Sequence, residues 1–486
     1  MYIKNKSLIP QLIKLTTFGL ALIFAVLAVA IADGKIKKLA CLMMAAGCIV
    51  PYYLVKRGTN NQIYLENPKL DLQFLIACSF IAMLLAGVTI PSDGNHGLFS
   101  AKSLSFLMTA GSLGLYILAK KRLSVDYLKT FGFLLAGFTF FLFWSAVGLI
   151  RNLTINESIS DQAKLFLLTL LVVIFTYIIV KEEIVSFSTF MKTLIYANFV
   201  YSFFKCFLVV LHFLKIINFF DFMEKTGMRF MSMDMGTGMI RLQTSVDMLS
   251  PFLVFFVLQA KPLGLKFPRY FQFIYLIISA FSIFLSFSRV LMFIGFLSLA
   301  LFWFTLEPSR LIKSIFLCAI LGALAIASIG INNVSAMIEK RLFSNDNYYS
   351  DRARTEQIEG LMKEYDYFPY LGKGMGGYTR DGIRDGKIPH SYEVQWVAFL
   401  MQFGIVGVLA LLSALSIIAR KYLTKDINNF SRMHLASFAL FGCWLLAGFT
   451  NPYLISLTSG IIYAIFLLVG IQINKSKNII PALEQS

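Results

Sequence analysis

The sequence predicts an all-α polytopic membrane protein, and its composition, its long apolar runs and the placement of its charges each lead to that prediction. Of 486 residues, 58% are hydrophobic and 14% are charged. A soluble domain typically holds about 45–50% apolar and about 25% charged residues. So few polar side chains cannot cover a water-soluble globule, and the chain therefore belongs to the membrane class.

About fourteen runs are long enough to be membrane spans, because about 20 helical residues cross a bilayer core. We place these spans at residues 15–32, 38–55, 73–91, 103–119, 130–150, 163–180, 191–214, 244–260, 270–288, 290–306, 312–331, 393–418, 434–450 and 453–472. The first run follows three lysines and also fits a cleaved signal peptide. Because thirteen spans follow it, we expect it to be retained as a helix.

The basic residues between the spans predict the orientation. With a cytoplasmic N-terminus, the inner segments hold 21 Lys and Arg, whereas the outer segments apart from 332–392 hold 9. Cytoplasmic loops carry the excess of basic residues, so both termini are expected inside and 332–392 outside. The net charge of +18 then mainly sets the orientation of the spans and attracts anionic lipid of the inner leaflet. No nucleic-acid-binding motif accompanies it.

This topology divides the chain into three expected parts. They are a bundle of about eleven spans at 1–331, a large extracytoplasmic loop at 332–392, and about three spans with a short cytoplasmic tail at 393–486. The loop is locally neutral, with nine basic and nine acidic residues. It is the one long stretch whose composition suits folding in water.

Two features are expected within this loop. Ile358, Leu361, Met362 and Tyr365 have the spacing of one helix face, which predicts an amphipathic helix over about 352–366. The glycine-rich stretch Leu371–Tyr378 lacks the Walker pattern, so we interpret it as flexible backbone.

Four arginines on the expected outer side are candidate phosphate ligands. Arg289 stands between two apolar runs, where its guanidinium either snorkels to the interface or holds a phosphate bidentately. Arg241 opens an unusually polar span entry that also fits helix capping. Arg352 and Arg354 follow Asp351 and form either a second anion clamp or a solvated, ion-paired helix start.

His390 is the candidate general base, since an imidazole titrates near neutral pH and this one stands where the large loop enters a span. The alternative is an ordinary interfacial histidine. Lys205 lies inside a span, where an ionisable group is a site candidate unless it snorkels or is paired. The outer side has no DxD, HExxH or His/Cys cluster, so no metal and no cofactor are expected.

Four motifs together resemble the bacterial O-antigen polymerase and O-antigen ligase superfamily, the Wzy-type polymerases and WaaL-type ligases. In chain order they are Ser286-Phe-Ser-Arg289, the stretch from Arg352 to Pro369-Tyr-Leu-Gly-Lys-Gly-Met-Gly-Gly-Tyr378, Pro389-His-Ser-Tyr392 and Gly404-Ile-Val-Gly407. The resemblance covers roughly 240–420. Gly404 comes fourteen residues after His390, about one helical turn more than the ligase pattern usually has, and Ser391 stands where many members have Asn.

The resemblance implies a metal-independent glycosyltransferase of the membrane-embedded GT-C type. It would act on the outer face of a bacterial inner membrane on a glycan linked to undecaprenyl diphosphate. It implicates His390 and arginines that by position are Arg289, Arg241, Arg352 and Arg354. Candidate protein partners are a chain-length regulator and a flippase.

The residues themselves agree with that chemistry. Breaking a sugar–diphosphate bond requires cations for the departing charge, and the attacking hydroxyl requires a base. Loop tyrosines, above all Tyr378 and Tyr392, are candidates for stacking on sugars.

Three functions stay open. The fourteen spans and the altered histidine-to-glycine spacing favour a polymerase of lipid-linked repeat units. A ligase would pass the glycan to lipid A–core or to a protein hydroxyl. A transporter of lipid-linked oligosaccharide fits the span number, but we see no duplicated halves in the sequence.

Overall fold

The chain is a mostly helical, multi-pass membrane protein. The computed structural model describes residues 68–90, 101–119, 125–151, 156–226, 231–234, 240–306, 312, 345–380, 383, 388–423 and 431–483. Within these ranges, six helices are long and apolar enough to cross a membrane: Leu72–Thr89, Lys129–Ile150, Glu157–Lys181, Phe187–Phe213, Gln395–Ala419 and Leu457–Lys475. Shorter apolar helices accompany them, at Lys102–Leu118, Ser245–Leu258, Arg269–Leu285, Arg289–Thr305 and Arg432–Ala447.

Eleven of the fourteen expected spans coincide with helical segments. The expected spans 15–32 and 38–55 lie outside the described residues, and so does 312–331 apart from residue 312. The helix expected at 352–366 is confirmed as part of a longer helix, Asn345–Tyr367. Of its expected apolar face, Leu361 is buried, whereas Ile358 is exposed. The compact units of the chain cut across the three parts expected from the sequence.

The first compact unit holds residues 1–124 and 175–232. In it, α3 (Pro68–Thr89) packs against α4 (Ala101–Ala119) and α7 (Phe187–Phe213). Phe80 of α3 stacks on Phe190 of α7, with the ring centroids 6.2 Å apart. Lys205 of α7 is fully buried. The short helix α8 (Phe219–Thr226) follows α7.

The second unit holds residues 125–174 and 233–486. Its elements are α5 (Val125–Ile150), the first part of α6 (Asn156–Lys181), β2 (Ile240–Gln243), the 3₁₀ helix η1 (Ser245–Met248), α9 (Ser250–Leu258), α10 (Arg269–Leu285), α11 (Arg289–Thr305), α14 (Asn345–Tyr367), α15 (Gln395–Ala419), α16 (Arg432–Ala447) and α17 (Leu457–Leu483). Strand β1 (Met231–Asp234) pairs with β2. Helix α9 is apolar on all sides and almost wholly buried, and it packs against α10 and α11.

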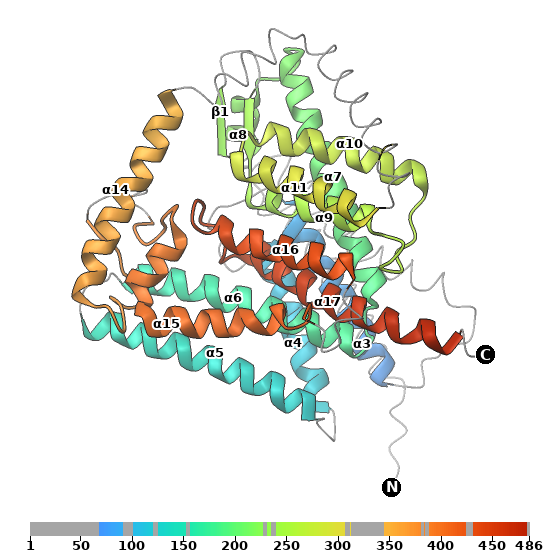
Figure 1. Ribbon diagram of the computed structural model, residues 1–486, viewed down its shortest axis with the longest axis horizontal. Coiled ribbons are helices and arrows are strands. Elements are labelled where there is room, and N and C mark those ends of the chain that lie inside the picture. The colour runs from blue at the N-terminus through green and yellow to red at the C-terminus, as the bar shows by residue number, and fades with distance from the viewer. Residues whose placement is uncertain are drawn as a thin grey trace, which may run out of the picture. The chain divides into compact units, whose positions relative to one another are not determined.

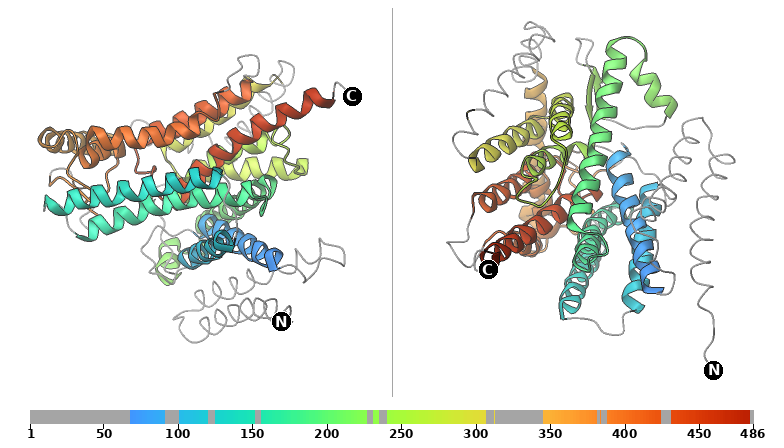
Figure 2. Two further views of the ribbon diagram at one scale, coloured as in Figure 1. Left: turned by 90° about the horizontal axis from the view of Figure 1, so that it is seen from below. Right: turned by 90° about the vertical axis from the view of Figure 1, so that its right-hand side faces the viewer.

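Helices α5, α6 and α15 run along one another (Figures 1 and 2). Aromatic side chains fill the space between them. Trp144 of α5 stacks on Phe140 at 4.3 Å between centroids and meets the edge of Phe403 of α15, and Phe166 of α6 lies 5.4 Å from Phe403. The Trp144 indole also donates hydrogen bonds to the carbonyls of Leu371 (3.1 Å) and Phe403 (3.0 Å).

Helix α15 is broken at Gly404, whose φ of 62° and ψ of −177° are not helical. The break removes backbone partners on both sides of it, and a buried backbone group without a partner is costly inside a membrane. The segment 369–374 replaces them. Ile405 and Val406 N–H donate to the carbonyls of Pro369 and Tyr370 at 3.0 and 3.2 Å, while the carbonyls of 401 and 402 each accept, at 2.8 Å, from the N–H groups of 373 and 374.

The glycine-rich stretch is therefore a docked, buried segment and not the flexible backbone expected from its sequence. Residues 372–377 are all buried. Gly374 has φ +99°, and a Cβ there would run into the backbone of Gly148 on α5. A glycine at 404 is required for the same two reasons, a φ of +62° and the nearby backbone of Tyr370. These glycines serve close packing.

Candidate functional site

A chain of ion pairs joins the N-terminus of α11, the first turns of α14 and the segment before α15. Arg289 Nη2 lies 2.8 Å from Asp351 Oδ1, and the same oxygen lies 2.8 Å from Arg354 Nη1. Arg354 Nε continues the chain to Glu393 Oε2 at 2.8 Å. We call Arg289–Asp351–Arg354–Glu393 the ion-pair chain. Its formal charge is zero, and it brings two of the four candidate arginines to one carboxylate.

Local physics explains why these charges meet. Arg289 is the first residue of α11, where the helix dipole disfavours a cation, so a carboxylate beside it is favourable. Asp351 and Arg354 are three residues apart on α14, hence neighbours on one face. The hydrogen bond from Arg289, together with the positive charges of Arg289 and Arg354, lowers the pKa of Asp351 below its ordinary value.

Arg241 braces the turn that leads into α11. Its Nε donates to the carbonyl of Ser286 at 3.2 Å, and its Nη2 donates to Gln243 Oε1 at 2.7 Å. Phe287 in this turn is buried with φ +46°, a conformation that costs a non-glycine residue about 1–3 kcal/mol. The two apolar runs on either side of Arg289 are thus joined by a short turn at 286–288, and Arg241 bonds to its first residue.

Arg352 is not brought to the ion-pair chain. Its Nε pairs with Glu356 at 3.0 Å, and both side chains are exposed. Residues two apart on a helix do not share a face, so α14 presents Arg354 to the ion-pair chain and turns Arg352 away. The expected shared anion clamp of Arg352 and Arg354 is wrong in this respect.

His390 is buried, with 6% of its surface exposed. Neither ring nitrogen has a hydrogen-bond partner within the described residues. By contrast, His212 Nδ1 accepts from Phe219 N–H, and His434 bonds to Ser431 and Asn474. Burial lowers the pKa of His390 below its ordinary value, and the charge of Asp161 partly offsets that effect. A neutral imidazole with unoccupied nitrogens can accept a proton.

His390 is close in sequence to the ion-pair chain, although its side chain makes no hydrogen bond to that chain. Glu393, the end of that chain, is three residues from His390. Three residues span at most about 11 Å, so the two Cα atoms lie within that distance.

Sequence reasoning missed two buried glutamines beside His390. Gln162 of α6 and Gln402 of α15 bond to each other, Nε2 to Oε1, at 2.6 Å. Gln402 Nε2 also donates to the carbonyls of Gly377 (2.8 Å) and His390 (3.3 Å). A glutamine in or at the end of an apolar run was the available signal, because such residues are rare in spans.

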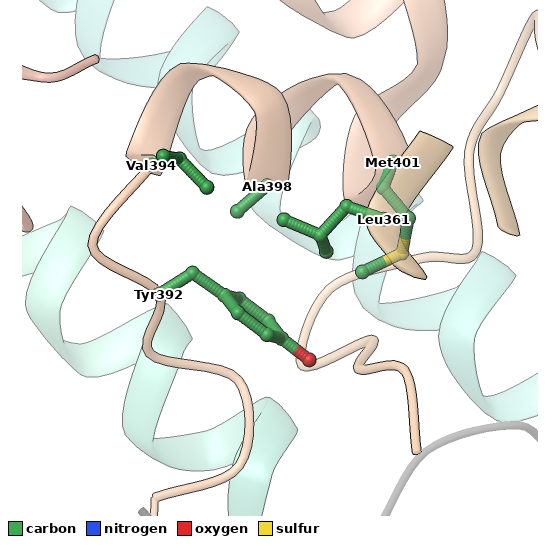
Figure 3. Packing of buried hydrophobic residues seen from close by; sticks show 5 residues of the cluster. All are labelled: Leu361, Tyr392, Val394, Ala398 and Met401. Carbon is green, nitrogen blue, oxygen red and sulfur yellow. The ribbon is translucent and has the colours of Figure 1, made fainter. Parts of the chain in front are cut away.

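Tyr392 packs in a hydrophobic cluster and is not available to a sugar, so the expected glycan contact is wrong for this residue. It is 1% exposed and lies with Leu361, Val394, Ala398 and Met401 (Figure 3). Its hydroxyl accepts from Thr379 N–H at 2.8 Å. Tyr378 packs against the same cluster and is only partly buried. Two other loop tyrosines, Tyr367 and Tyr370, are exposed.

Comparisons with known proteins do not assign this site. No family model, curated protein or solved structure matches the chain. Among the residues that the structure describes, no three His, Cys, Asp or Glu side chains gather so as to hold a metal ion. The site is therefore interpreted from its own chemistry.

Proposed function

We propose that the chain is a membrane glycosyltransferase that polymerises undecaprenyl-diphosphate-linked oligosaccharide repeat units on the outer leaflet. One observation carries the proposal: Arg289 and Arg354 share one carboxylate, and the ion-pair chain that contains them ends three residues from His390, whose imidazole has no hydrogen-bond partner among the described residues. Paired guanidiniums suit a diphosphate, and a neutral imidazole suits a hydroxyl.

In the proposed reaction, a hydroxyl oxygen of the acceptor sugar attacks the anomeric carbon of the donor glycan. The bond from that carbon to the diphosphate oxygen breaks, and undecaprenyl diphosphate leaves with the electron pair. His390 takes the hydroxyl proton, while Arg289 and Arg354 stabilise the charge on the leaving group. Direct displacement inverts the anomeric centre.

The arginines of the ion-pair chain have hydrogen-bond donors left for this ligand. Each guanidinium carries five N–H groups, and the bonds to Asp351 and Glu393 use two nitrogens of each arginine. A diphosphate can bind the remaining donors or replace Asp351, whose side chain is more than half exposed. Since exposed ion pairs are worth little, such an exchange costs little.

The break in α15 favours a second candidate, a transporter of lipid-linked oligosaccharide. Transporters often place discontinuous helices at their substrate sites. Here, however, the backbone groups freed at Gly404 are bonded to residues 369, 370, 373 and 374. Because those groups are occupied, we interpret the break as a packing feature and not as an ion or substrate site. We therefore rank transport second.

The experiment is an acceptor assay with purified protein in liposomes and undecaprenyl-diphosphate-linked repeat units as the only substrate. A ladder of longer lipid-linked products supports a polymerase. Strict dependence on a second acceptor, lipid A–core or a protein hydroxyl, would make the protein a ligase. Movement of the lipid across the bilayer without a new glycosidic bond would make it a transporter.

Variants connect the activity to the site. We expect Arg289→Ala to lower the transfer rate about 10²–10³-fold, as for one lost charge-stabilising donor. We expect His390→Ala to lower it about 10²–10⁴-fold. Arg352→Ala is the matched control, because Arg352 pairs with Glu356 on the exposed side of α14 and lies outside the ion-pair chain, and it should retain activity. Full activity of Arg289→Ala or of His390→Ala would refute the proposed mechanism.

A further inference from the structure

A second hydrogen-bond chain, made of neutral groups, runs through the buried side of the site. Gly376 N–H donates to Gln162 Oε1 at 2.5 Å, and Gln162 Nε2 donates to Gln402 Oε1 at 2.6 Å. Gln402 Nε2 then donates to the carbonyls of Gly377 and His390. We call these groups the glutamine chain. It joins α6 and α15, which are 240 residues apart at these positions, to the main chain on both sides of residues 378–389.

Each amide in the glutamine chain has one workable orientation. Gln162 must turn its oxygen toward the Gly376 N–H, so its nitrogen faces Gln402. Gln402 must turn its nitrogen toward two carbonyls, and its two N–H groups match those two acceptors. Both side chains are at most 1% exposed, so water does not compete for these bonds.

The imidazole of His390 has no comparable support of its own. A working histidine is usually oriented by a hydrogen bond on its second ring nitrogen. Neither nitrogen of His390 has such a bond within the described residues, while its carbonyl accepts from Gln402. The ring is therefore held through its backbone and its packing.

We propose that Gln402 and Gln162 are positioning residues that fix His390 for proton transfer. The inference rests on the proposed function in that His390 is taken as the base. A catalytic group must be held within about 0.5 Å of its productive position. Here the glutamine chain supplies that restraint by tying the His390 carbonyl and the glycine-rich segment to two membrane helices.

A matched control separates this role from a general role in folding. Gln395 lies on the same helix, seven residues before Gln402. It is also buried, and its Oε1 accepts from Leu454 N–H at 2.6 Å. Gln395→Met and Gln402→Met thus each remove a buried amide from α15 with little change of volume, and only the second removes a bond to His390.

The test measures the position of His390 without any glycan substrate. Full-length protein in nanodiscs is treated with diethyl pyrocarbonate, and modification of His390 is followed by peptide mass spectrometry, with His212 and His434 as internal references. We expect Gln402→Met to raise the rate at His390 about tenfold, since local opening follows from the loss of buried bonds. Gln395→Met should leave that rate within about twofold of the wild type.

A second variant and a second measurement keep the proposal open to refutation. If Gln402→Met does not yield folded protein, Gln162→Met removes the neighbouring link and should raise the His390 rate in the same direction. In the transfer assay, we expect Gln402→Met to lower kcat with KM nearly unchanged. Unchanged His390 reactivity, or an equal rise in Gln395→Met, would overturn the positioning role. A selective rise in a protein that shows no transfer would retain the positioning role and refute the proposed function.

Discussion

The ion-pair chain and the glutamine chain meet the same short segment, residues 390–393, in opposite ways. The first is charged and partly exposed, and its arginines can exchange one carboxylate for another anion. The second is neutral and buried, and each of its side-chain N–H groups has its own acceptor. Exposed ion pairs add about 0–1 kcal/mol to stability, whereas a buried polar group without a partner costs about 1–3 kcal/mol. We therefore expect ligand exchange at the first chain and fixed geometry at the second.

The largest effect on stability is expected in the buried glycine-rich segment, which depends on close backbone contact. Gly374→Ala places a Cβ against Gly148 of α5 at a φ of +99°. Strain and overpacking together should destabilise the protein by about 2–6 kcal/mol. Thermal unfolding in detergent measures the effect. Gly442→Ala is the control, since nothing lies within 4 Å of its added Cβ, and it should unfold like the wild type or slightly later. Equal stability of the two variants would contradict a docked glycine-rich segment.

An intermediate, pH-dependent effect is expected from His390. Its pKa is lowered in the folded protein, so between the folded and unfolded pKa values the unfolded chain binds more protons. The free energy of unfolding should therefore fall as the pH drops below 6.5, with a slope of at most about 1.4 kcal/mol per pH unit. Unfolding from pH 5 to 8 (about one unit or more on each side of the ordinary histidine value) measures the slope.

Two variants sharpen this prediction. His390→Gln should remove its contribution to the slope. Asp161→Asn should extend the contribution to lower pH, because the carboxylate charge that raises the pKa of His390 is gone. An unchanged slope in His390→Gln would mean that this imidazole does not titrate as a buried group.

The smallest effect on stability is expected on the exposed side. Asp351→Asn should change the free energy of unfolding by less than about 1 kcal/mol. Because it frees Arg289 and Arg354 from a competing carboxylate, it should tighten binding of inorganic diphosphate about three- to tenfold at low salt. Calorimetric titration measures this, with Glu356→Gln as the control for an exposed carboxylate elsewhere on α14. A fall of several kcal/mol in the free energy of unfolding, or weaker diphosphate binding, would contradict the different roles expected for the two chains.

The membrane class and most described helices could be predicted from the sequence, because hydropathy reports directly on them. The expected sidedness, with both termini inside, stays a prediction. Arg289 meets Asp351, and Arg241 meets Ser286, all on the expected outer side. His434 meets Asn474 near the expected inner side. In each pair, both residues lie at helix ends that the expected alternation of spans puts on the same side of the membrane.

The details of the site were less accessible to sequence reasoning. Residue type and position singled out Arg289, Arg354 and His390 as site candidates. They could not show that helix rotation separates Arg352 from Arg354. Gln162 and Gln402 are far apart in sequence, so nothing local connects them. Tyr392 was assigned to sugar by residue type, whereas its position in the apolar cluster decides its role.

The break at Gly404 also bears on how the chain enters its membrane. Residues 369–374 precede α15, so the ribosome makes the groups that complete the broken helix before the helix itself. If α15 were inserted with that segment still in water, four main-chain groups would face hydrocarbon without partners, each costing several kcal/mol. Insertion of α15 and docking of the preceding segment are thus expected to occur as one cooperative event during biosynthesis.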